Sequence, residues 1–122
     1  MTFHVDSSTG KKLGIAEISG RLDARNSGEL LTSFASWLQH TGLFIFDCTS
    51  LDLIDSSGLG AVVSCLRKAI ENNGDLKLAN LAPKVSMVFE LTKAKQLFSV
   101  FPDTSSAIQS FLNSGPELKT AP

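Results

Sequence analysis

A short, uninterrupted apolar run near the middle of the chain constrains the fold more than any other feature. Leu43-Phe44-Ile45-Phe46 is followed directly by the polar Asp47. Four residues are too few for a helix, and an apolar run without polar alternation indicates a strand that is covered on both faces. Such strands belong mainly to parallel sheets with helical cover. The run therefore predicts the central strand of a sheet of this kind.

Segments with helical spacing of apolar residues lie on both sides of this run. In the first, Asn26 and Glu29 resemble a capping box, and Gly42 suits the left-handed residue after a last turn. The second begins near Asp55 and continues to 72–74. The apolar residues that fall on one face are Leu30, Leu31, Phe34, Trp37 and Leu38 in the first helix and Leu59, Val62, Val63, Leu66 and Ile70 in the second.

The remaining segments continue this alternation. Strands are predicted over 3–5, 13–18, 76–79 and 98–101. Further helices are predicted from Pro83 and from a cap at Asp103 or Thr104, whereas Arg21-Leu22-Asp23 is predicted to be a connector. Helix and strand alternation requires crossover connections. The fold class is therefore α/β, with a mixed, mainly parallel sheet of about five strands covered by about four helices.

Length and composition favour one globular domain. The chain has 122 residues, of which 43% are hydrophobic and 19% charged, so it can bury a single core. We expect a domain over 1–113 and a disordered polar tail over 114–122. The net charge of -1 offers no basic field for nucleic acid or anionic lipid. We therefore expect no direct nucleic-acid partner.

No targeting or membrane-spanning pattern is visible in the sequence. The N-terminus lacks a basic region followed by an apolar stretch, and no run of about 18 apolar residues occurs. We expect a cytoplasmic protein without membrane insertion. Cys48 and Cys65 are too far apart for a CxxC motif and too few for a disulfide scaffold, so we expect both to be buried hydrophobic residues.

The motif Asp55-Ser56-Ser57-Gly58-Leu59-Gly60 joins an apolar segment to the second helix. Two hydroxyls beside a carboxylate at a helix start stand where a phosphate can be bound or repelled. The glycines leave the backbone open to close approach. The structural alternative is that Asp55 and the serines cap the helix. The motif is thus either a cap, a switch, or both.

Catalytic and metal-binding interpretations of the motif are disfavoured. A phosphate-binding loop needs a lysine that is missing here, and the acyl-transfer elbow needs a glycine where Ile54 stands. A nucleophilic Ser56 would need His4 or His40 as its base, and neither is expected to reach it. Magnesium would suit the carboxylates, but their spacing matches no known ligand pattern. We therefore expect no catalytic residue, no metal and no other cofactor. The carboxylates considered are Asp23, Asp47, Asp52 and Asp55.

The motif in its context closely resembles the STAS family of anti-sigma factor antagonists, which are bacterial partner-switching regulators. The resemblance is carried by 51–60 between an apolar strand and a helix, by Ile18-Ser19-Gly20-Arg21-Leu22-Asp23, and by the segment from Leu91-Thr92 to Val100-Phe101. It covers nearly the whole chain except the two termini. The resemblance implies a STAS-like fold and a non-enzymatic role in signal transduction and transcription regulation.

The resemblance also implies roles for individual residues. The serine directly after the Asp is the phosphorylated one in the family, which favours Ser56 over Ser57, whereas chemistry alone accepts either. Asp23 matches an acidic position near that serine. The implied partner-binding residues are Asp23, Asp55, Ser56, Ser57, Gly58 and Leu59. We expect Leu59, in the first helical turn, to be exposed enough to touch a partner.

The implied partners are an anti-sigma factor that is also a serine kinase of the GHKL type, and a PP2C-type phosphatase that acts on phosphorylated Ser56. The unmodified protein would bind the anti-sigma factor, and phosphorylation would release it. An alternative within the same family is a small subunit that docks on a lipid or anion transport assembly without a phosphorylation cycle. The double serine and the intact Gly58-Leu59-Gly60 favour the switch.

Overall fold

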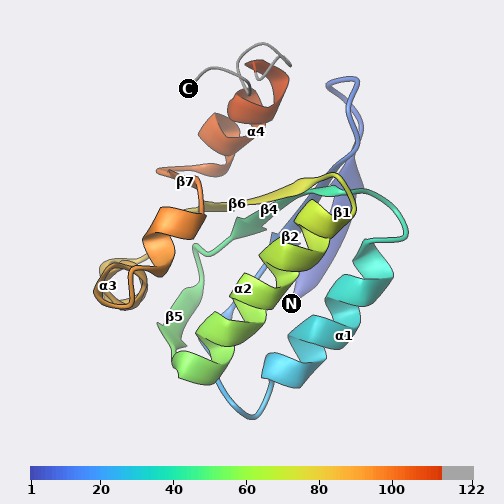
Figure 1. The fold of residues 1–122 in the computed structure, drawn as a ribbon. Helices are drawn as coiled ribbons and strands as arrows, with labels where there is room; N and C mark the ends of the chain where they lie inside the picture. The colour runs from blue at the N-terminus through green and yellow to red at the C-terminus, as the bar shows by residue number, and fades with distance from the viewer. Residues whose placement is uncertain (114–122) are drawn as a thin grey trace.

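The protein is known from a computed structural model that describes residues 1–113 (Figure 1). The predicted tail over 114–122 lies outside the described residues. The strands are β1 Thr2–Asp6, β2 Leu13–Glu17, β3 Gly20–Leu22, β4 Leu43–Asp47, β5 Leu51–Ile54, β6 Asp75–Ala79 and β7 Val100–Phe101. The helices are α1 Ser27–Trp37, α2 Ser56–Glu71, α3 Pro83–Leu91 and α4 Thr104–Asn113, with a 3-10 helix, η1, at Ala94–Leu97.

The main sheet has five strands in the order β1-β2-β4-β6-β7. β1 runs antiparallel to β2, and every other neighbouring pair is parallel. This arrangement confirms the predicted α/β class with a mixed, mainly parallel sheet of five strands and four α-helices. β4 lies in the middle of the sheet, as its apolar run predicts.

A second, two-stranded sheet was not predicted. β3 pairs in parallel with β5, and the register shifts between Gly20 and Arg21. The prediction that 21–23 is only a connector is therefore wrong, because three residues are too short to show a strand period. The last strand is also shorter than predicted, since β7 contains only Val100 and Phe101 and is preceded by η1.

The first helix begins at the predicted position after Asn26, but the predicted side-chain cap and the predicted end at Gly42 are wrong. Asn26 precedes α1, but its side chain makes no capping hydrogen bond. Gly42 lies well beyond Trp37, the last residue of α1, and it is not among the residues with positive φ. Gly42 instead meets Gly74 after α2, where an added Cβ on Gly74 would lie 1.8 Å from the Gly42 carbonyl oxygen. The glycine pair therefore allows two loops to touch.

The main core lies between the sheet and the three helices α1, α2 and α3. Phe44 and Phe46 of β4 point into it and are almost fully buried. The Phe34 ring of α1 lies 4.5 Å from that of Phe44 between centroids, and Trp37 stacks on Phe3 at 4.8 Å. Cys48 and Cys65 are both buried, as expected, and burial raises the pKa of each thiol to about 12. Phe34 belongs to the core, and Trp37, which is partly buried, packs against it.

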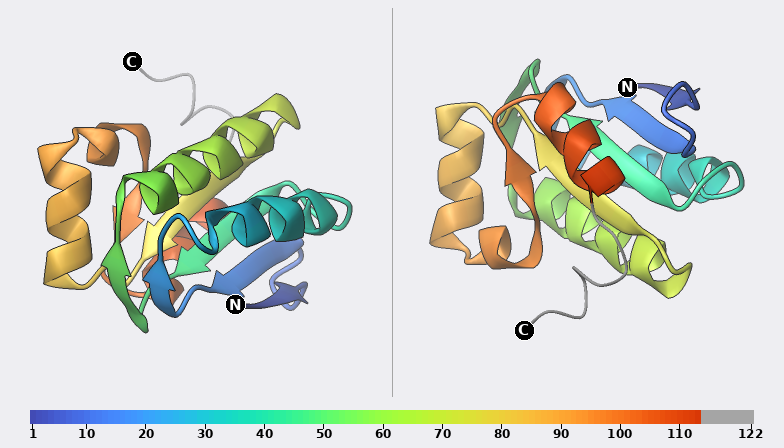
Figure 2. Two further views of the ribbon diagram at one scale, coloured as in Figure 1. Left: turned by 90° about the horizontal axis from the view of Figure 1, so that it is seen from below. Right: turned by 90° about the horizontal axis from the view of Figure 1, so that it is seen from above.

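The opposite face of the sheet is covered, within residues 1–113, by α4 (Figure 2). Ile45 and Phe111 belong to the smaller core cluster on this side. Lys77 of β6 is buried here, with its Nζ 4.0 Å from the centroid of the Phe111 ring and donating to Ser110 Oγ at 2.8 Å. Asp103 accepts from the Ser106 N–H at 2.7 Å, which confirms a cap at the start of α4. The central strand is thus buried on both faces.

Candidate functional site

The motif occupies the junction between β5 and α2. Asp55 precedes the helix, and its Oδ1 accepts a hydrogen bond from the Gly58 N–H at 2.9 Å. This confirms that Asp55 caps α2. The Asp55 N–H in turn donates to the Leu22 carbonyl oxygen at 3.2 Å, so the end of β3 is tied to the start of the helix.

Gly58 brings these two elements into backbone contact. An added Cβ on this residue would lie 2.1 Å from the Leu22 carbonyl oxygen and 2.7 Å from its carbonyl carbon. No side chain fits in such a space, so the buried Gly58 has a packing role. Gly58 is buried, so the prediction that it binds a partner directly gains no support from its position.

Ser56 and Ser57 are both exposed in the first turn of α2. Within residues 1–113, no hydrogen bond holds either hydroxyl. Ser56 lines a groove along α2, together with Gly60 and Val63, whereas Ser57 is not among the residues that line it. Both hydroxyls are therefore accessible to a modifying enzyme, and the preference for Ser56 stays a prediction.

Leu59 does not meet the expectation of an exposed partner contact. Leu59 is only 8% exposed and belongs to the main core cluster. Leu59 faces inward because it shares the buried side of α2 with Val62 and Leu66, which follow it at successive helical intervals of three and four residues. Leu59 contributes only an edge of its side chain to the groove beside Ser56.

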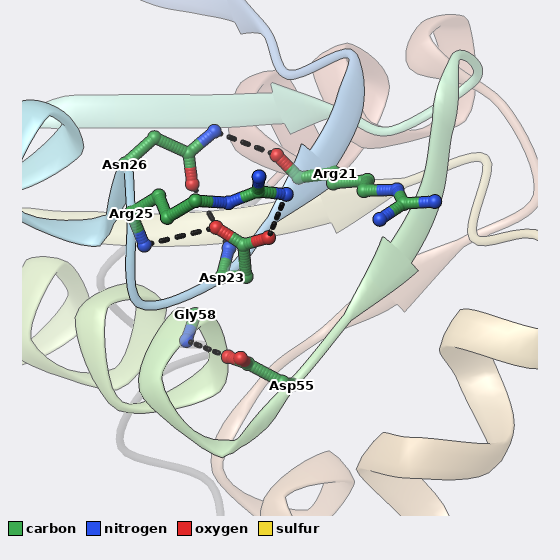
Figure 3. A network of polar contacts seen from close by, with 6 residues as sticks. All are labelled: Arg21, Asp23, Arg25, Asn26, Asp55 and Gly58. Carbon is green, nitrogen blue, oxygen red and sulfur yellow. Dashed lines mark hydrogen bonds and ion pairs between the residues drawn. The ribbon is translucent and has the colours of Figure 1, made fainter.

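Asp23 lies in the turn between β3 and α1, on the same side of the molecule as Asp55 (Figure 3). Its carboxylate accepts from Arg25 twice, from Nη2 at 3.2 Å and from the backbone N–H at 3.0 Å. These hydrogen bonds from Arg25 lower the pKa of the Asp23 carboxyl. Within the part of the chain that the structure describes, Asp23 forms no hydrogen bond with either serine.

Two hydrogen bonds of the Asn26 side chain, which the sequence analysis did not predict, hold this turn. The Asn26 side chain accepts from the Asp23 N–H at 2.9 Å and donates to the Arg21 carbonyl oxygen at 2.7 Å (Figure 3). Asn26 therefore closes the turn that presents Asp23 instead of capping α1. The sequence did contain a signal for this turn, namely an Asn three residues after an Asp, because Asn side chains often bond to the backbone of nearby turn residues.

A shallow hollow joins the acidic residues. It measures about 210 Å³ and is lined by Asp23 and Asp55 with Arg21, Leu22, Leu53 and Ile54. Leu53 of β5, which helps to line the hollow, is 46% exposed. The structure thus brings Asp23 and Asp55 to one hollow at the start of α2, where the two serines follow Asp55, and the sequence alone could suggest this only through the family resemblance.

The four carboxylates considered for a cation have separate partners or positions. Asp47 accepts from Thr49 and from Asn80, while Asp23 and Asp55 are engaged as described above. In residues 1–113, no group of three or more His, Cys, Asp or Glu residues is arranged to hold a metal ion. Asp52 is exposed and stands apart from these hydrogen bonds.

The two histidines lie on other elements. His4 is exposed on β1, at the edge of the main sheet, and His40 is exposed after α1. Across the described residues, no hydrogen bond joins either imidazole to Ser56. Neither histidine is therefore placed by a hydrogen bond to act as a general base for Ser56 in the described residues.

Comparisons with known proteins connect this architecture to one family. The model of the STAS domain family matches residues 5–107. The anti-sigma-B factor antagonist of Staphylococcus aureus is 25% identical over 101 residues, which are 82% of this chain and 94% of that protein. None of the helices formed by residues 1–113 combines the length and apolar character needed to cross a membrane.

Solved structures share the fold at lower sequence identity. SpoIIAA, the anti-sigma factor antagonist of Bacillus, superposes in its unphosphorylated form with a TM-score of 0.74, 21% identity, and coverage of 93% of this chain and 99% of that chain. Its phosphorylated form gives a TM-score of 0.66 at 20% identity, covering 90% and 99%. A sulfate transporter family protein of Wolinella succinogenes gives 0.72 at 16% identity, covering 80% and 83%.

Proposed function

This chain belongs to the STAS domain family, and from that membership we propose that it is an anti-sigma factor antagonist controlled by phosphorylation of Ser56. The observation that carries the proposal is the pair of exposed serines at the start of α2, next to the Asp55 cap, which shares a hollow with Asp23. The protein acts in the cytoplasm as a binding protein and supplies no catalysis of its own.

The partner is an anti-sigma factor that is also a serine kinase of the GHKL type. It binds the unmodified chain through the face formed by Asp23, Asp55, Ser56 and Ser57, phosphorylates Ser56, and then dissociates. A PP2C-type phosphatase removes the phosphate and restores binding. The names of the relatives support this assignment, since one is an anti-sigma-B factor antagonist and SpoIIAA is known in both phosphorylation states.

The charge change explains why modification releases the partner. A neutral hydroxyl can be desolvated against a partner at modest cost, whereas a phosphate adds about -1.5 to -2 charges. The carboxylates of Asp23 and Asp55 lie on the same face and add to the negative potential there. A loss of about 1.4 kcal/mol in binding free energy lowers affinity tenfold, so a few kcal/mol exchange the partner.

Substitution of the two serines tests the proposal. We expect Ser56→Ala to keep partner binding and lose phosphate uptake, and Ser56→Asp to lower binding by at least about tenfold. Ser57→Ala is the matched control for the phosphorylation site and should retain phosphate uptake. The measurement is a pull-down from native lysate followed by mass spectrometry and a kinase assay with the recovered protein. Wild-type phosphorylation of Ser56→Ala would show that the site is misassigned.

A second candidate function is suggested by the shared fold of the Wolinella protein. In it, the chain is a subunit that docks on a lipid or anion transport assembly without a phosphorylation cycle. The same pull-down separates the two functions, because this candidate predicts recovery of a membrane transporter without a kinase. It also predicts that the Ser56→Asp variant and the wild-type chain bind that transporter equally well.

A further inference from the structure

A groove of about 450 Å³ begins at Ser56 and continues along one side of α2. Ser56, Gly60, Val63 and Arg67 form its wall on the helix at intervals of three and four residues. Because an α-helix rises 1.5 Å per residue, Arg67 lies roughly 16 Å from Ser56 along the axis. The opposite wall is the segment from Thr92 through η1.

The groove has an apolar lining that continues onto an exposed apolar surface. Leu59, Val63, Ala94 and Leu97 line it. Leu97 is 57% exposed, and Leu91, just before the opposite wall, is 77% exposed. Exposed apolar residues that gather beside a groove are typical of a surface that binds another protein.

The charged residues that line the groove are all positively charged. They are Arg67 and Lys93, with no carboxylate among the lining residues. Within residues 1–113 neither cation takes part in an ion pair. The hollow on the other side of the motif is lined by Asp23 and Asp55 and includes the cation Arg21 at its edge. The groove and the hollow therefore differ in charge.

We propose that this groove binds an acidic, partly apolar segment of the partner protein, an inference that rests on the proposed function and assigns it a second contact surface. An apolar side chain of that segment packs between Val63 and Leu97, and its carboxylates pair with Arg67 and Lys93. A basic segment would be repelled by both cations, and a wholly apolar one would bury them without compensation. Charge complementarity thus selects an acidic occupant.

The test uses the full chain and a random peptide library displayed on phage, so that it requires neither the kinase nor modification of Ser56. We expect the selected peptides to combine Asp or Glu with large apolar residues. A double variant, Arg67→Glu with Lys93→Glu, should weaken their binding at least about tenfold, more at low salt than at high salt. Lys12→Glu reverses one charge in the loop between β1 and β2, away from the groove, and should bind like wild type, whereas Arg67→Glu alone, with the same change in charge, should weaken binding.

Amide chemical shifts of the wild-type chain with a selected peptide locate the contact. Changes at 63–67 and 92–97 support the proposal. It is overturned if no peptide is enriched, if the enriched peptides are basic, or if the double variant binds them as tightly as wild type while its near-UV circular dichroism is unchanged. In each of those cases the Ser56 pull-down can still succeed, so failure of the groove and failure of the switch are distinguishable.

Discussion

Asp23 is held by contacts within its own turn, and this limits what it can do before a partner arrives. Both of its carboxylate oxygens accept hydrogen bonds from Arg25, and within residues 1–113 Asp23 makes no hydrogen bond that would orient Ser56. A partner cation that binds Asp23 must share it with Arg25 or displace the guanidinium. Because the Arg25 side chain is 77% exposed, that exchange has a small desolvation cost.

Removal of the Arg25 side chain should raise the pKa of Asp23. In wild type the hydrogen bonds from Arg25 depress this pKa, and Arg25→Ala removes the guanidinium but keeps the backbone N–H donor. We expect a partial return toward the ordinary value of about 4. The measurement is a titration of the Asp23 side-chain carboxyl by carbon NMR, with Lys12→Ala as the control. An unchanged pKa would contradict the assigned cause.

The pH dependence of stability follows from the sign of this shift. A carboxyl with a depressed folded-state pKa stabilises the fold above its unfolded pKa, and the contribution disappears as the pH falls through the folded value. The contribution of Asp23 is therefore present at neutral pH, and it changes with pH only in acidic solution below about pH 4. Arg25→Ala should flatten that acidic region of the stability curve and lower the free energy of unfolding at neutral pH, as measured by urea denaturation at both pH values.

At the scale of elements, the contact of α2 with β3 determines where the motif sits. Asp55 joins them by hydrogen bonds, and Gly58 lets the two backbones touch. The helix start, the two serines and the Asp23 turn are consequently one rigid arrangement. Its geometry depends on Gly58, for which the sequence analysis predicted only that a partner could approach the backbone closely.

The two glycines of the motif should respond in opposite directions to alanine. Gly58→Ala would put a Cβ against the Leu22 carbonyl, a backbone atom that cannot move away without separating the elements, so we expect a loss of about 1–3 kcal/mol or more. Gly60→Ala meets nothing within 4 Å in an exposed helical position and should stabilise by up to about 1 kcal/mol. Urea denaturation of both variants measures this. Equal effects would contradict the close approach.

How much could be predicted from sequence also depends on the element. β4 was predictable because its apolar run reports burial on both faces, and α2 because its apolar residues recur over 16 residues. β3 was missed since three residues show no period, and its partner β5 alternates imperfectly. The start of α1 at Asn26 was predictable, but its side-chain cap was wrong because Asn26 bonds to the preceding turn, and the predicted end was wrong because Gly42 packs on Gly74.

At the candidate site, local chemistry was predictable and long-range assembly was not. The Asp55 cap could be inferred from residue type and spacing. The groove could not, because its walls, 56–67 and 92–97, are far apart in sequence and meet only through tertiary packing. The closeness of Asp23 to the motif came from family resemblance, and its physical cause is the parallel pairing of β3 with β5.

For the whole molecule, the two core clusters lie away from the exposed serines. Neither cluster includes Ser56 or Ser57, and the sheet is covered by helices on both faces without them. A charge added at position 56 therefore changes the surface and leaves the core packing intact. This separation allows a modification to control binding without controlling folding.

Ser56→Asp should consequently preserve stability. A negative charge in the first turn of a helix interacts favourably with the helix dipole, so we expect the free energy of unfolding to be unchanged or raised by up to about 1 kcal/mol. Ser36→Asp places the same charge near the end of α1, where the dipole has the opposite sign, and should lower the value by about 0.3–1 kcal/mol. Urea denaturation and near-UV circular dichroism measure both. A loss of tertiary signal in Ser56→Asp would mean that its weaker partner binding reflects unfolding, whereas retained signal assigns that weakening to the charge at the interface.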